Sequence, residues 1–145
     1  MTHKYIGTKV ITAWSADRDG EAGYGVKYAD GYSSWSPKAV FEEAYRCCEG
    51  DSQAMTFGDA IYMLKEGKKV ARAGWNGKGM WLVLVPGTAT VNFTEGSPYQ
   101  KAGLVSGEIL PHIDMYTTNA DGRRAMLPGW LASQTDMLAT DWQAV

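Results

Sequence analysis

The pattern of apolar and polar residues is clearest from Met55 to Pro86, where its first part predicts a helix. After Thr56 the apolar residues recur at intervals of three and four positions, which gives a helix one apolar face. These residues are Phe57, Ala60, Ile61 and Leu64. Asp59, three positions after Thr56, predicts a start close to a capping box. Gly67 predicts the end of the helix, because glycine readily adopts the left-handed conformation that follows helices.

The same stretch then predicts two strands joined by a tight turn. Lys69–Arg72 is long enough for a short strand, and Met80–Val85 is a continuous apolar run that Pro86 closes. Between them, Gly74–Gly79 contains residues that tolerate positive φ. The turn therefore holds an aromatic ring and an amide, those of Trp75 and Asn76, beside several basic side chains. The basic residues are Lys68, Lys69, Arg72 and Lys78.

Upstream, three short segments have the composition of strands. Lys4–Trp14 is rich in β-branched residues, and Tyr24–Tyr28 and Tyr32–Trp35 are aromatic. Asp30-Gly31 between the last two segments favours a hairpin turn. These features predict three N-terminal strands.

A helix is predicted directly after these strands. Ser36 is expected as its N-cap and Pro37 as its first residue. One face would carry Val40, Phe41, Ala44, Tyr45 and Cys48. Residues 1–50 thus predict a small β-β-β-α module, with 49–53 as the linker to a second domain over 54–145. About fifty residues are marginal for independent folding, so we expect the module to dock on the rest of the chain or on another copy.

Towards the C-terminus the pattern predicts two more strands, a short helix and a last strand. Gly87–Phe93 and Glu108–Tyr116 have strand composition, and no conformation is predicted for the loop 94–102. Ser133 followed by Asp136 predicts a capped helix, and Trp142–Val145 the last strand.

Together these elements predict an α+β fold. Its centre is a curved antiparallel sheet with the helix from Thr56 packed on it and a short C-terminal helix, preceded by the β-β-β-α module. The strands expected in the sheet are those at Lys69, Met80, Val91, Glu108 and Trp142.

Two blocks of the sequence resemble a known family. The first is FGDAIYMLKEGKKVARAGWNGKGMWLVLVPG (Phe57–Gly87), and the second is PGWLASQTDMLATDWQAV (Pro128–Val145). In this order they resemble the Thoeris anti-defence 2 family of phage proteins. The upstream segment YSSWSPKAVFEEAYR resembles leaders of other phage proteins, and no activity transfers from it.

The resemblance implies a protein that is not an enzyme and needs no cofactor. Members sequester nucleotide immune signals, notably glycocyclic ADP-ribose and in some cases cyclic di- or trinucleotides. They do so as homotetramers with pockets between protomers, and a dimer is the alternative if the N-terminal module blocks one interface. The implied location is the cytoplasm of the infected bacterial host. A phage structural or protein-interaction module using the same aromatic surface is the second hypothesis, and an enzyme degrading the messenger is the third.

Composition agrees with this interpretation. The 145 residues are 45% hydrophobic and 21% charged, and they contain neither an apolar run near 18 residues nor an N-terminal signal pattern. We therefore expect a soluble protein with no membrane partner. A net charge of −2 argues against a broad basic surface, so polymeric DNA or RNA is not an expected partner. An aromatic share of 12% exceeds what one small core readily hides, which favours subunit contacts.

Candidate catalytic and metal-binding residues are few. Cys47 and Cys48 are adjacent, so a disulfide between them would be strained, and no three-ligand metal spacing occurs. His112 and Asp114 are expected on one side of a strand, but nothing places a nucleophile near them. Gly74–Gly79 lacks the phosphate-loop pattern. No catalytic or metal-binding residue is predicted.

Nucleotide binding is matched better, because aromatic faces stack on bases and basic groups pair with phosphates. The predicted ligand-binding residues are Arg72, Trp75, Asn76, Lys78, Trp81, Trp130, Thr135 and Asp136. Among them, Trp75 is expected to stack on the ligand, and Asn76 to hydrogen-bond to it.

The remaining roles are assigned by chemistry. Arg72 and Lys78 would contact phosphate, and Asp136 with Thr135 would contact ribose hydroxyls. Two alternatives stay open. Trp75 and Trp81 are equally explained as core or interface aromatics, and Asp136 as the N3 residue of a helix capped by Ser133.

Overall fold

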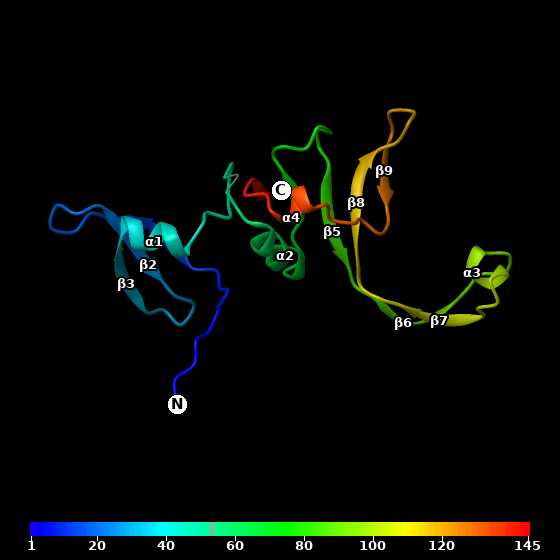
Figure 1. The fold of residues 1–145 in the computed structure, drawn as a ribbon, viewed down its shortest axis with the longest axis horizontal. Helices are drawn as coiled ribbons and strands as arrows, with labels where there is room; N and C mark the ends of the chain where they lie inside the picture. Colours follow the sequence, from blue (N-terminus) through cyan, green and yellow to red (C-terminus); the bar gives the residue numbers. More distant parts are fainter. Residues whose placement is uncertain (53) are drawn as a thin grey trace. The chain divides into compact units, whose positions relative to one another are not determined.

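The computed structural model describes residues 1–52 and 54–145, with mixed helices and antiparallel strands (Figure 1). The α+β prediction is confirmed. The chain forms two compact units, Met1–Cys47 and Cys48–Val145. The domain limits at 50 and 54 stay predictions.

The first unit is a three-stranded antiparallel sheet followed by a helix. Its elements are β1 (Thr12–Ser15), β2 (Gly23–Lys27), β3 (Ser33–Pro37) and α1 (Lys38–Ala44), with strand order β1-β2-β3. At the β2–β3 turn, Gly31 has a φ of 88°, and the Asp30 Oδ1 atom accepts from the Tyr32 N–H at 3.0 Å. The predicted hairpin turn is therefore confirmed.

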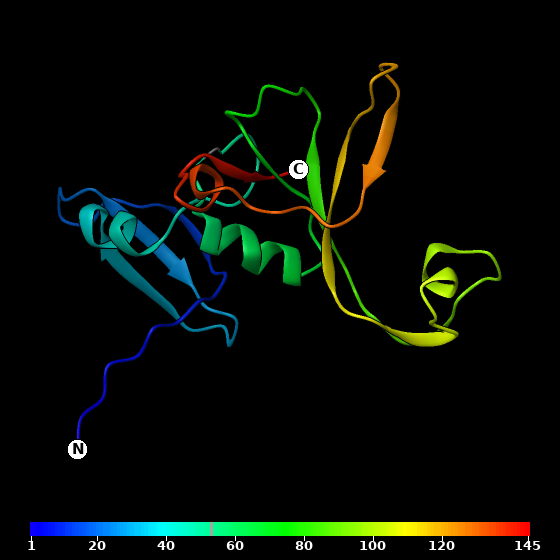
Figure 2. The same cartoon turned by 45° about the vertical axis from the view of Figure 1, so that its right-hand side comes forward.

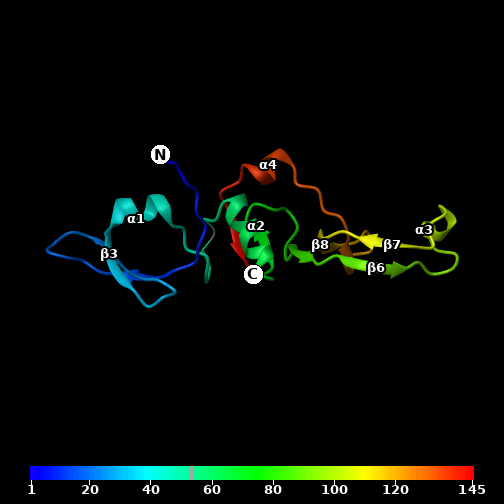
Figure 3. The same cartoon turned by 90° about the horizontal axis from the view of Figure 1, so that it is seen from below.

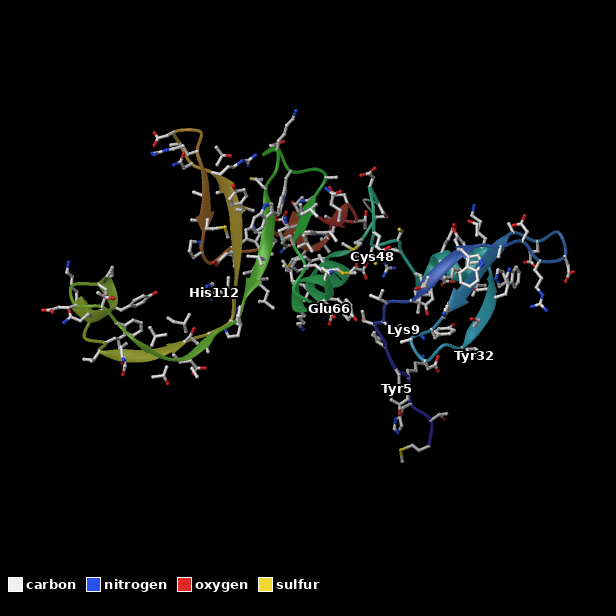
Figure 4. All side chains as sticks on the ribbon, turned by 180° about the vertical axis from the view of Figure 1, so that it is seen from behind. Tyr5, Lys9, Tyr32, Cys48, Glu66 and His112 are labelled. Carbon is white, nitrogen blue, oxygen red and sulfur yellow. The ribbon has the colours of Figure 1, made fainter. Side chains whose placement is uncertain are left out.

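The prediction of a strand over Lys4–Trp14 is wrong for most of its length. Thr12, the first residue of β1, pairs with Lys27, the last residue of β2. Residues before Thr12 run past the end of β2 and have no strand partner among the described residues. The ammonium of Lys9 on this segment lies 4.4 Å from the Tyr28 ring centroid (Figure 4). A segment rich in β-branched residues does not form a strand unless a neighbouring strand is available for backbone hydrogen bonds.

The predicted start of α1 is also wrong. Ser36 lies in β3 opposite Tyr24, so Pro37 becomes the N-cap, and no side chain caps this helix. The Phe41 ring stacks on the Tyr24 ring with a centroid separation of 4.2 Å, which attaches α1 to the sheet.

The predicted inner face of α1 is only partly correct. Val40 is 59% exposed. The helix ends at Ala44, because Tyr45 is extended, so Cys48 does not belong to it. Cys48 instead packs against the core of the second unit.

The second unit begins with α2 (Phe57–Lys65), which starts and ends as predicted. Thr56 and Asp59 form a full capping box, in which the Thr56 N–H donates to Asp59 Oδ2 at 2.8 Å. After the helix, Gly67 has a φ of 79°. The buried residues that join α2 to the sheet form one apolar core. They are Met55, Ala60, Met63, Leu64, Val70, Leu82 and Trp142.

Five antiparallel strands form the main sheet of this unit, in the order β10-β4-β5-β8-β9. They are β4 (Val70–Arg72), β5 (Trp81–Val85), β8 (His112–Thr118), β9 (Arg124–Leu127) and β10 (Trp142–Ala144). Figure 2 shows β8 (yellow) beside β5 (green), with β9 (orange) returning along β8. The predicted strands at 69–72, 80–85 and 142–145 are present, whereas β9 was not predicted.

The predicted membership of the sheet is wrong at two strands. The segment at Val91 forms β6 (Thr88–Asn92), which pairs only with β7 (Ser106–Ile109) in a separate two-stranded sheet. The expected strand Glu108–Tyr116 is divided at Pro111 into β7 and β8, because proline has no N–H to donate to a ladder. Figure 3 shows the β6–β7 ribbon extending away from α2.

Two short helices complete the second unit. α3 (Pro98–Lys101) lies in the loop for which no conformation was predicted, with the Ser97 side chain accepting from the Gln100 N–H. α4 (Gln134–Met137) begins with the predicted capping box of Ser133 and Asp136.

Candidate functional site

The turn between β4 and β5 is held at both ends by charged side chains. At its start, Asp141 Oδ2 accepts from the Gly74 N–H at 2.7 Å, and Asp141 Oδ1 accepts from Arg72 Nε at 2.8 Å. At its end, Arg124 Nη2 donates to the Lys78 carbonyl oxygen at 2.8 Å. An exposed turn rich in glycine therefore has a defined course.

A second carboxylate, that of Asp136, connects the same turn to α4. Its Oδ1 atom accepts from Arg72 Nη1 at 2.9 Å and from Trp75 Nε1 at 3.1 Å. Its Oδ2 atom accepts from the Ser133 hydroxyl at 2.7 Å, within the capping box. Asp136 thus has the predicted capping role, and both of its oxygens are occupied.

These contacts shift the pKa values of the charged groups. Burial raises the pKa of Asp136, but hydrogen bonds from Arg72, Ser133 and Trp75 outweigh that effect and lower it to about 2. The hydrogen bond from Arg72 likewise lowers the pKa of Asp141. The Arg72 pKa is raised by its hydrogen bonds to Asp141 and then Asp136. All three groups are therefore charged at neutral pH.

Trp75 belongs to an aromatic cluster at the edge of the core. Its ring centroid lies 5.5 Å from that of Trp142 and 6.3 Å from that of Trp130, both in edge-on geometry. Trp142 is fully buried, and its Nε1 donates to the Asp136 carbonyl oxygen at 3.0 Å. Trp75 is half-buried, so it is both a packing residue and accessible.

A pocket of about 360 Å³ lies beside the turn. Its lining comes from β4, the turn, the start of β5 and the C-terminal strand: Ala71, Arg72, Ala73, Trp75, Gly77, Lys78, Gly79, Met80, Trp81, Gln143 and Val145. Ala71 pairs with Gln143, and both alternate with residues that pack in the core, so they point to the sheet face away from α2. This volume is near the lower limit of small-molecule sites.

The wall of the pocket at Trp81 continues as a row of side chains across the sheet. The rings of Trp81 and Tyr116 are stacked, with centroids 4.7 Å apart. Lys69 Nζ lies 5.1 Å from the Trp81 centroid, and Arg124 Cζ lies 5.7 Å from the Tyr116 centroid. Two aromatic rings are therefore flanked by two cations, an arrangement suited to ligands with an aromatic ring and negative charge.

Comparison with known proteins identifies the region that carries this site. A family profile described as the Thoeris anti-defense 2-like domain matches residues 55–145. The chain belongs to this family. It is 38% identical over 92 residues to Thoeris anti-defense 2 of Bacillus phage SP01, covering 63% of this chain and 94% of that protein. The resemblance found in the sequence is confirmed, and membership supports a role in phage anti-defence.

The predicted site residues fall into two groups within the Thoeris anti-defence 2-like domain. Arg72, Trp75, Lys78 and Trp81 line the pocket. Trp130, Thr135 and Asp136 lie on the C-terminal side, where Trp130 packs in the aromatic cluster and Thr135 is exposed on α4. Asn76 is exposed on the turn but is not part of the lining. Trp75 connects the groups, because it lines the pocket and donates to Asp136.

Sequence reasoning missed four residues that shape the site of this domain. They are Tyr116, Arg124, Asp141 and Gln143. Asp141 reaches back 69 positions to Arg72, and Tyr116 meets Trp81 only through the β5–β8 register. The local sequence contains no signal for either contact.

His112, labelled in Figure 4, and Asp114 lie two positions apart on one side of β8, and neither belongs to the pocket lining. His112 Nε2 is 3.5 Å from Asp114 Oδ1, and the buried Asp114 accepts from the Gly129 N–H at 3.0 Å. Over the described residues 1–52 and 54–145, no group of three His, Cys, Asp or Glu side chains could hold a metal ion. No helix within those ranges is long and apolar enough to cross a membrane.

Proposed function

We propose that this protein binds a cyclic nucleotide immune messenger, glycocyclic ADP-ribose first among the candidates, and sequesters it without cleavage. The observation that carries the proposal is the pocket walled by Trp75 and Trp81, with Lys78 on its rim, inside the region that defines the family. Aromatic faces and cations are the groups that bind bases and phosphates. The relative from Bacillus phage SP01 has the name Thoeris anti-defense 2, and the same role is proposed here for this chain.

The geometry supports different roles for the predicted residues. Trp81 and Trp75, which line the pocket, are assigned the aromatic contacts with a ligand there, and Lys78 is assigned the contact with its phosphates. Asn76, exposed on the turn, is assigned a hydrogen bond to the ligand, and the exposed Thr135 is assigned a contact with a ribose hydroxyl.

Arg72 and Asp136 act, in this proposal, by holding the turn rather than by touching the ligand. The Arg72 side chain is 14% exposed and donates to two carboxylates, and that of Asp136 is 13% exposed with both oxygens accepting. A phosphate would have to displace two charge-assisted hydrogen bonds to reach Arg72, which makes Lys78 the better candidate.

The proposed assembly is a homotetramer in the cytoplasm of the infected host, with a dimer as the alternative. Large apolar side chains are exposed on the second unit, among them Val105 at 77%, Leu131 at 89% and Leu138 at 79%. Such side chains favour contacts with further copies. Light scattering that finds a monomer at micromolar concentration would count against the proposed assembly.

Calorimetric titration tests the binding. The full-length protein should bind glycocyclic ADP-ribose with saturable heat, and a panel of cyclic di- and trinucleotides would define selectivity. A ligand at 100 times its dissociation constant should stabilise the protein by about 2.7 kcal/mol, which thermal denaturation detects. Absence of binding to every nucleotide in the panel would contradict the proposal. It would favour the second candidate, a protein-interaction module, which the exposed apolar side chains named above also support.

A further inference from the structure

The two faces of the Trp81 ring have different neighbours. Tyr116 from β8 covers one face, with ring planes 19° apart and centroids separated by 4.7 Å. The neighbouring strand on the other side of β5 is β4, so the second face looks towards β4 and the pocket. This second face is the one that Tyr116 does not cover.

The residues of β4 leave room beside that second face. Val70 pairs with Leu82, and both are fully buried in the core. Because side chains alternate along strands, Lys69, Ala71 and Trp81 point to the opposite face of the sheet. Ala71, the lateral neighbour of Trp81, has only a methyl group, and it forms part of the pocket floor. A planar ring can therefore lie over Ala71 against the indole.

Lys69 lies over the Trp81 ring, beside this space. Its ammonium lies 5.1 Å from the Trp81 ring centroid, and the residue is exposed. A cation over an exposed ring is held more weakly than a stacked base. The lysine stem is flexible, so a displaced ammonium stays within reach of charged groups attached to the entering ring.

We propose that Trp81 stacks on the purine ring of a nucleotide in this pocket, and that Lys69 makes the site selective for phosphorylated ligands. When the base enters, the Lys69 ammonium leaves the indole and pairs with the ligand phosphate. The bicyclic indole matches a purine in extent, which favours purine over smaller rings. The inference rests on the proposed function for the location of the ligand, and it adds the group that distinguishes a nucleotide from a nucleoside.

The test compares adenosine with ADP, which share the base and differ in the diphosphate. Lys69→Ala should weaken ADP binding by about 3- to 10-fold, because a phosphate contact is lost. The same variant should bind adenosine equally well or up to about 5-fold more tightly, because no ammonium has to be displaced. Lys68→Ala is the matched control, since it removes the same charge from the adjacent exposed residue and should leave the ADP-to-adenosine ratio unchanged.

Opposite effects on the two probes cannot arise from a merely structural role of Lys69. The inference would be overturned if Lys69→Ala changed the affinities for adenosine and ADP equally, or changed neither. It would also be overturned if Lys68→Ala changed the ratio of the two affinities as Lys69→Ala does. Wild-type protein that binds neither probe at millimolar concentration would overturn it as well. Binding of glycocyclic ADP-ribose is measured in parallel on the same samples. If glycocyclic ADP-ribose binds but Lys69→Ala does not affect ADP and adenosine differently, only this inference fails. If glycocyclic ADP-ribose does not bind but Lys69→Ala does affect ADP and adenosine differently, only the proposed messenger is wrong.

Discussion

Asp141 is predicted to be the main attachment of the β4–β5 turn. Replacing it by alanine removes the acceptor for Arg72 Nε at 2.8 Å and for the Gly74 N–H at 2.7 Å. Arg72 then retains Asp136 as its carboxylate partner. The Gly74 N–H would then donate to water. The turn, which forms part of the pocket, would no longer be held in one conformation.

The magnitude follows from the two lost contacts. Hydrogen bonds to charged groups contribute about 1.5–3 kcal/mol each when they are well buried. The Asp141 side chain is 29% exposed, so water compensates for part of the loss. We expect Asp141→Ala to lower the free energy of unfolding by about 2–3 kcal/mol, and Asp141→Asn by about 1–2 kcal/mol because the amide keeps one acceptor.

Urea denaturation at pH 7 measures this change, provided that the dependence of the unfolding free energy on urea is the same in all variants. Asp121→Ala is the control, because Asp121 pairs with Arg123 at 2.9 Å while its side chain is 70% exposed. Such a surface pair should contribute less than about 0.5 kcal/mol. Equal stability of Asp141→Ala and Asp121→Ala would refute the view that Asp141 holds the turn.

Three further predictions concern the same region. The pKa of Asp136 is lowered to about 2 in the folded protein, against about 3.9 in an unfolded chain, so its contribution to stability should be complete above about pH 5 and lost as the pH falls through about 2. Asp136→Asn should remove that part of the pH dependence in acid denaturation, and an unchanged profile would contradict it. Gly79→Ala should destabilise the turn, because its φ is 70° and the new Cβ would lie 2.7 Å from Arg124 Nη2; melting temperatures measure this, and a wild-type value would contradict it. Asn76→Ala should weaken ligand binding by about 0.5–1.5 kcal/mol in calorimetry without changing the melting temperature, whereas unchanged affinity would remove Asn76 from the site.

Helices α2 and α4 of the second unit were predictable because their signals are local. Thr56 with Asp59, and Ser133 with Asp136, lie three positions apart, and each pair forms the capping box that its spacing implies. The limits of β5 follow from an apolar run closed by a proline in the same way. Where both partners of a contact lie within one turn of helix or one strand, the sequence contains the information directly.

Two of the errors involve partners distant in sequence, and a third involves a local signal. Residues before Thr12 have strand composition but run past the end of β2, so no ladder forms. The four residues of β9 have no strand signal of their own and are ordered by pairing with β8. The local signal is Pro111, which fits the alternating pattern of one strand but lacks the N–H that a continuous ladder would need, so β7 and β8 are separate.

For the candidate site, the sequence indicated residues that share one pocket but not the contacts between them. Arg72, Trp75, Lys78 and Trp81 were selected for their chemistry, and all four line one pocket. That Arg72 is held by two carboxylates depends on the pairing of β4 with β10, which brings Asp141 to the turn. Composition cannot reveal such a pairing, because it depends on strand order and register.

Recovery of intact ligand tests the central claim most directly. The purified protein is incubated with glycocyclic ADP-ribose for many hours and separated from free ligand, then denatured by heat, and the released nucleotide is identified by chromatography and mass spectrometry. The proposed function predicts that the protein retains the ligand and that the released molecule is the unchanged input. A linear or hydrolysed product would make the protein an enzyme, and failure to retain any ligand would contradict sequestration.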